Sequence, residues 1–176
     1  MNRIVRVLAV SLVCLCTLGY SPIGLSSDCV KLVFNRFCLG GPSETLPAVV
    51  PLPERSQETE YFQVLGSDKY LEVGVVNDQI SLLTRYEQPG DWLNFTDWRS
   101  KLIRLYGQPE DLSSFPAYAS SRSSRLNAIN AGRGYAHVRW QQPGFSIALV
   151  WNHRDHIELR YQLDAAAIPS SNDEGL

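Results

Sequence analysis

The sequence lacks the short motifs that mark the common enzyme classes. It contains no G-x-S-x-G nucleophile elbow, no Walker loop, no glycine-rich dinucleotide fingerprint and no H-E-x-x-H zinc motif. We therefore expect a protein without catalytic residues and without a cofactor. The alternative is a hydrolase whose catalytic residues are dispersed along the chain, because such a site leaves no local motif.

Aspartate and glutamate are absent from residues 112–154, although the whole chain is slightly acidic, with 18 acidic and 16 basic residues. Such a balance is not typical of nucleic-acid-binding proteins. The segment contains arginines and serines, whose guanidinium and hydroxyl groups bind carboxylates and phosphates. We predict that an anionic partner, a protein or a polymer of the cell envelope, binds Arg122, Arg125, Arg133 and Arg139. The alternative is that these arginines pair with the acidic residues of the segment 42–60.

A hydrophobic run long enough to span a membrane is also missing. Residues 7–18 are apolar, but a spanning helix needs about 20 such residues. The run follows Arg3 and Arg6 and precedes Gly24 and Ser26, which is the pattern of a secretory signal peptide cleaved after Ser26. We expect export to the periplasm or the extracellular space, with no stable membrane span after cleavage. An uncleaved N-terminal anchor and a lipid-modified cysteine are the alternatives.

Cysteine is scarce: after the leader, the chain contains only Cys29 and Cys38. Exported compartments are oxidising, so we expect the two to form a disulfide. A straight helix would separate their Cα atoms by about 13–14 Å, whereas a disulfide needs less than about 7 Å. We therefore predict a short N-terminal helical turn that the disulfide closes, since helical spacing relates Val30, Val33, Phe34 and Phe37.

Alternating apolar residues predict two groups of three strands. The first covers residues 61–86, with breaks at residues 66–68 and 77–78, and the second covers residues 135–163. Between them, apolar spacing of three and four predicts a helix from Phe95 to Tyr106, capped by Asn94 or Thr96 and ended by Gly107. The expected fold is α+β, an antiparallel β-sheet built from two meanders with one main α-helix packed on it.

The chain divides by composition into four parts. Residues 1–26 form the predicted signal peptide, and residues 27–60 the disulfide-closed segment with a proline-rich acidic strap. Residues 61–168 form a single α+β domain, and the polar residues 169–176 a disordered tail. Residues 109–134 have a weak pattern and are predicted to be a long loop.

The histidines could indicate a zinc site and the four tryptophans a ligand pocket, but we favour neither interpretation. His153 and His156 have a spacing seen in zinc sites, but they fall in a predicted polar turn without further ligands, so we expect no metal. Trp98, Trp140 and Trp151 fall on predicted core faces, and Trp92 at a rim.

Together these features predict a small, exported, non-catalytic protein that binds an anionic envelope component or a partner protein. Another possibility is a secreted enzyme inhibitor or immunity-type protein, in which the arginine-rich loop would enter the target's site.

Overall fold

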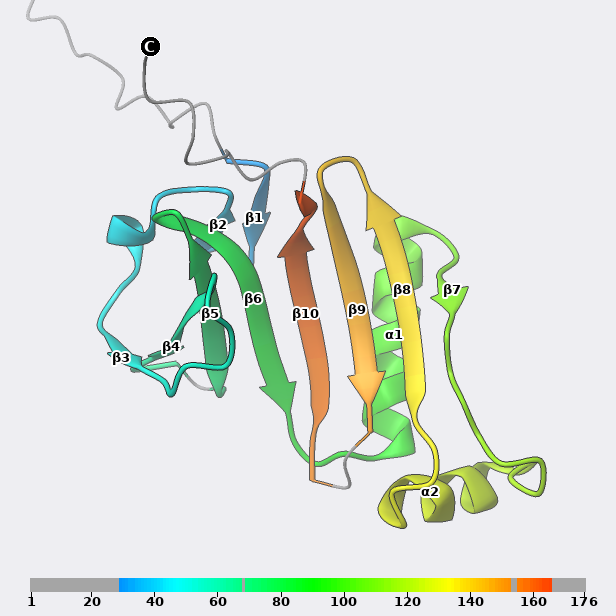
Figure 1. Ribbon diagram of the computed structural model, residues 1–176. Coiled ribbons are helices and arrows are strands. Elements are labelled where there is room, and N and C mark those ends of the chain that lie inside the picture. Colours follow the sequence, from blue (N-terminus) through cyan, green and yellow to red (C-terminus); the bar gives the residue numbers. More distant parts are fainter. Residues whose placement is uncertain (1–28, 68, 153–154, 166–176) are drawn as a thin grey trace, which may run out of the picture.

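The computed structural model describes residues 29–67, 69–152 and 155–165. The predicted signal peptide, the polar tail and His153 lie outside these residues. The described chain forms one eight-stranded antiparallel sheet in the order β3-β4-β5-β6-β10-β9-β8-β7 and a separate two-stranded hairpin, β1-β2 (Figure 1). The elements are β1 (Lys31–Val33), β2 (Phe37–Leu39), a 3-10 turn (Ser43–Thr45), β3 (Val49–Pro51), β4 (Glu60–Val64), β5 (Leu71–Val76), β6 (Gln79–Glu87), α1 (Trp92–Tyr106), β7 (Glu110–Asp111), α2 (Arg122–Asn130), β8 (Ala136–Gln142), β9 (Phe145–Trp151) and β10 (Ile157–Leu163).

The predicted α+β fold is confirmed in outline. Strands β4 to β6 and β8 to β10 lie where alternation placed them, and the turn at Asn77 and Asp78 has positive φ at both residues, as a tight hairpin requires. The two groups join because β6 pairs with β10, with Thr84 opposite Arg160 and Leu83 opposite Tyr161. The meanders therefore form one continuous sheet, which β3 and β7 extend at its two edges.

The N-terminal segment is a β-hairpin, so the predicted helical turn is wrong. Val33 and Phe37 pair across a turn in which Phe34 and Asn35 have positive φ. The apolar residues of this segment fit strand alternation as well as helical spacing, and the packing of the hairpin onto the sheet decides between them. The predicted disulfide between Cys29 and Cys38 is present, with Cα atoms 5.4 Å apart.

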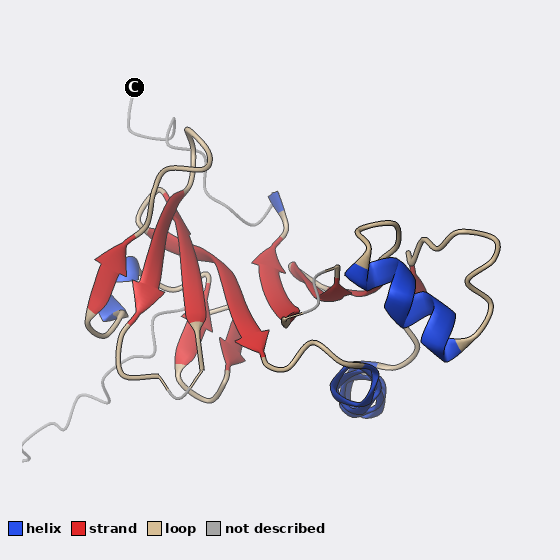
Figure 2. Cartoon of the chain, turned by 90° about the horizontal axis from the view of Figure 1, so that it is seen from below, coloured by secondary structure: helices blue, strands red, loops and turns tan. Residues whose placement is uncertain are grey.

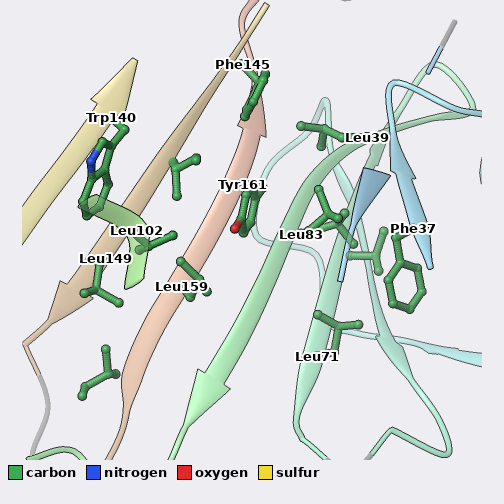
Figure 3. Packing of buried hydrophobic residues seen from close by; sticks show 14 of the residues in the cluster. Phe37, Leu39, Leu71, Leu83, Leu102, Trp140, Phe145, Leu149, Leu159 and Tyr161 are labelled. Atoms are coloured by element: carbon green, nitrogen blue, oxygen red, sulfur yellow. The ribbon is translucent and has the colours of Figure 1, made fainter. Parts of the chain in front are cut away.

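One face of the sheet carries the hydrophobic core. The hairpin covers this face near β6 and β10, where the rings of Phe34 and Tyr161 meet edge to face at 5.6 Å. Helix α1 covers the same face beside β9, where Phe95 packs against the buried Trp151. Figure 2 shows α1 end-on against the sheet, and Figure 3 shows the apolar side chains that meet between the layers.

Helix α1 begins three residues earlier than the sequence predicted. Asp91 caps it by accepting a hydrogen bond from the Asn94 amide at 2.8 Å, and Gly107 ends it with φ 82°. Phe95 and Leu102 are buried, whereas Leu105, which fits the predicted apolar stripe, is 72% exposed. No helix in the described residues is both long enough and apolar enough to cross a membrane.

Candidate functional site

Residues 112–135 form an excursion between β7 and β8 that we call the arginine lobe. Its two ends are joined at a neck, where the Ser114 and Tyr135 amides each donate to the other residue's carbonyl, at 3.0 and 2.9 Å. The Leu112 amide also donates to the His137 carbonyl at 2.8 Å. Helix α2 lies within the lobe, at the end of the sheet from which β8 starts (Figure 1). The segment that the sequence predicted as a long loop is therefore partly helical.

Helix α2 has well-defined ends. The Ser124 amide donates to the Ser121 hydroxyl at 3.1 Å, and the Ser121 amide donates to the Ser124 hydroxyl at 2.9 Å, forming a capping box. At the other end, Gly132 has φ 64°, and the Arg133 amide donates to the Ala128 carbonyl at 2.8 Å, as in a Schellman motif. Sequence reasoning missed this helix, although the paired serines and the following glycine were its signals.

Three of the four predicted binding arginines belong to the lobe. Arg122 and Arg133 are exposed, whereas Arg125 is half-buried, and its Nε donates to the Ala119 carbonyl at 3.2 Å. Each guanidinium lies over an aromatic ring, and such cation–π contacts restrict the side chain without neutralising its charge. The pairs are Arg122 over Trp92 at 5.9 Å, Arg125 over Phe115 at 5.1 Å and Arg133 over Tyr118 at 5.8 Å.

The fourth predicted residue, Arg139, lies outside the lobe. It is on β8 and forms a salt bridge of 2.9 Å with Glu110 of the edge strand β7. The acidic strap contains β3, at the opposite edge of the sheet from β7 (Figure 1). Among the described residues, no ion pair links the strap to the lobe arginines, so the structure gives no support to the alternative in which the two pair.

An open hollow of about 330 Å³ lies at the neck of the lobe, lined by Ser114, Arg133, Gly134, Tyr135 and other residues. The backbone is tightly packed here, because a Cβ atom on Gly134 would lie 2.8 Å from Cδ1 of Phe115. Arg133 therefore lines a concave surface beside a tightly packed stretch of backbone. This arrangement can hold an anionic group of a ligand.

Electrostatic effects at the neck act on two titratable residues. Hydrogen bonds from Ser113 lower the pKa of the Asp111 carboxyl, and the positive charges of Arg99 and Arg125 add a smaller effect. The pKa of His137 is lowered mainly by burial and further by the positive charges of Arg139 and Arg160. The folded protein therefore disfavours the protonated form of His137.

We expect the free energy of unfolding to decrease as the pH falls from 7.5 to 5, in part because of His137. The unfolded chain binds a proton at this histidine near pH 6.5, whereas the folded chain resists it, so acid favours unfolding. Urea unfolding at both pH values should show a smaller pH effect in His137→Asn than in the wild type. An equal pH effect in the two proteins would contradict this role of His137.

A second cluster of titratable residues lies on the face of the sheet opposite the hairpin and α1. Arg55 of the strap donates two hydrogen bonds to the buried carboxylate of Glu72, at 2.8 and 3.1 Å. Burial and the nearby carboxylates of Glu72 and Glu158 raise the pKa of the Tyr86 hydroxyl. Because Arg55 neutralises the buried carboxylate, we interpret this cluster as the contact that fixes the strap to the sheet.

The described residues contain no group of histidine, cysteine and acidic side chains that could hold a metal ion. Trp140 and Trp151 are buried in the core, whereas Trp98 is half-buried. Trp92, predicted at a rim, is also half-buried and lies 6.1 Å from the Trp151 ring. Comparisons with models of protein families, with curated proteins and with solved structures gave no match for this chain.

Proposed function

We propose that the protein is an exported, non-catalytic binding protein that holds an anionic partner through the arginine lobe. The observation that carries the proposal is that Arg122, Arg125 and Arg133 come together in one lobe whose sequence contains no carboxylate. Segregation of positive charge raises the local potential and steers anionic partners toward the surface. The partner is a protein with an acidic surface or an anionic polymer of the envelope.

The aromatic contacts make the lobe suited to binding. A flexible arginine loses conformational entropy when a ligand immobilises it, which reduces affinity. Arg122 and Arg133 are exposed, yet each already lies on a ring, so less freedom remains to be lost. Each guanidinium can bind a carboxylate or phosphate through two parallel hydrogen bonds.

Export is the second part of the proposal. Its support is the charged and apolar pattern of residues 1–26 together with the disulfide between Cys29 and Cys38. Disulfides of this kind persist in oxidising compartments, which include the periplasm and the extracellular space.

The double variant Arg122→Glu/Arg133→Glu tests the lobe. We expect it to bind poly-glutamate and polyphosphate at least about tenfold more weakly than the wild type, a change of about 1.4 kcal/mol or more. Wild-type binding should also weaken with added salt, because exposed charges are screened within about 8–10 Å. Fluorescence anisotropy with labelled polymers measures both effects. Arg125 is left unchanged because its side chain is bonded within the lobe.

The matched control is Lys101→Glu/Arg104→Glu, which makes the same charge change at exposed positions of α1. It should bind like the wild type if the position of the charges matters. If both double variants lose affinity equally, only net charge matters, and if neither loses affinity, the lobe is not the binding surface.

A further inference from the structure

A second hollow lies away from the arginine lobe, between the tip of the β1-β2 hairpin and the turn from β4 to β5. It has a volume of about 250 Å³, and we call it the hairpin pocket. Figure 3 shows two of its lining residues, Phe37 on the hairpin and Leu71 on β5, on the core side of the sheet. The pocket is lined by Phe34, Arg36, Phe37, Lys69, Leu71 and Arg85, with residues of the turn.

Three cationic side chains from separate elements meet at this pocket. Arg36 comes from the hairpin turn, Lys69 precedes β5, and Arg85 lies on β6. Lys69 and Arg85 share one buried carboxylate, that of Glu87, at 3.3 and 2.6 Å. The described lining residues thus carry three positive charges and no carboxylate, and the buried Glu87 carboxylate pairs with two of these cations.

Aromatic rings hold both guanidiniums of the pocket. Arg85 lies 5.4 Å from the Phe34 ring and 5.5 Å from the Trp98 ring, and Arg36 lies 5.5 Å from the Phe37 ring. The ion pair of Arg85 with Glu87 uses Nε, and a guanidinium has four further N–H donors. The pocket therefore presents positioned donors before any ligand is bound.

We propose that the hairpin pocket binds a small organic acid, with its carboxylate on the three cations and its apolar part on the pocket wall. Phe34, Phe37 and Leu71 supply that wall. An inorganic anion would satisfy the cations but would leave the apolar wall in contact with water. An acid with a ring or a branched chain uses both parts of the pocket.

Titration of the purified, disulfide-intact protein with benzoate, acetate and inorganic phosphate tests this assignment. We expect saturable benzoate binding in the millimolar range or tighter, with amide shifts in the NMR spectrum at Ser67, Lys69 and Leu71. Acetate and phosphate should bind at least about tenfold more weakly, because neither covers the apolar wall.

Substitution of Arg36, the exposed cation of the pocket, tests whether benzoate binds at this site. Arg36→Gln should weaken benzoate binding about tenfold, whereas Arg104→Gln, an exposed arginine on α1, should leave it unchanged. Arg85 is kept, because its removal would deprive the buried Glu87 carboxylate of a partner. The lobe variant Arg122→Glu/Arg133→Glu should bind benzoate normally, which separates this pocket from the lobe.

Three outcomes would overturn the assignment. The first is the absence of saturable benzoate binding, and the second is a set of amide shifts that maps to the lobe. The third is equal affinity for benzoate, acetate and phosphate, which would mean that charge alone attracts anions to this surface.

Discussion

Trp140→Ala should lower the free energy of unfolding by about 3–5 kcal/mol. Trp140 is only 2% exposed and stands on β8, where its indole Nε1 donates a hydrogen bond of 2.8 Å to the carbonyl of Gly107 at the end of α1. The substitution removes a large buried ring and leaves a cavity. It also deprives the Gly107 carbonyl of its donor, so packing and hydrogen bonding are lost together.

Two further variants separate these contributions in urea unfolding. Trp140→Phe keeps most of the buried ring and loses the hydrogen bond, so a smaller cost of about 1–2 kcal/mol is expected. Trp98→Ala should also cost less than Trp140→Ala, because Trp98 is half-buried and packs partly on the side chains of Arg85 and Lys101. A cost below about 1 kcal/mol for Trp140→Ala would show that α1 does not depend on this contact.

The strands and the main helix could be predicted because their signals are local. Alternation locates β8 and β9, and Gly107 fixes the end of α1. Pairing between strands distant in sequence has no comparable local signal, so the pairing of β6 with β10 could not be predicted from the sequence. Residues 30–37 were misread because so short a run satisfies both periods, and burial of Phe37 against the sheet decides for the hairpin.

The candidate site was predictable only in part. The absence of carboxylates from residues 112–154 indicated the arginines of the lobe. It could not distinguish them from Arg139, which forms a salt bridge with Glu110 on the two-residue strand β7. The ring beneath Arg122 belongs to Trp92 of α1, and only the fold brings them together. The hairpin pocket left no sequence signal, because Arg36 and Arg85 meet through tertiary packing.

Cys29→Ser/Cys38→Ser should lower the free energy of unfolding by about 2–3 kcal/mol, as expected for a disulfide that closes a loop of this length. Without the crosslink the unfolded chain gains conformational freedom, and the hairpin must be held by packing alone. Leu39 and Phe37 are buried, so some of that packing remains. Urea unfolding of the oxidised wild type and the double variant measures the difference.

Loss of the disulfide should affect ligand binding at the hairpin pocket more than binding at the arginine lobe. The hairpin supplies Phe34, Arg36 and Phe37 to the hairpin pocket, whereas the arginine lobe is built from other elements. At urea concentrations where the double variant remains folded, benzoate binding should therefore weaken while polyanion binding by the lobe stays unchanged. The wild type treated with a reductant should behave like the variant, which controls for the serine substitutions. A loss below about 0.5 kcal/mol, with benzoate binding intact, would mean that β-sheet packing alone fixes the hairpin.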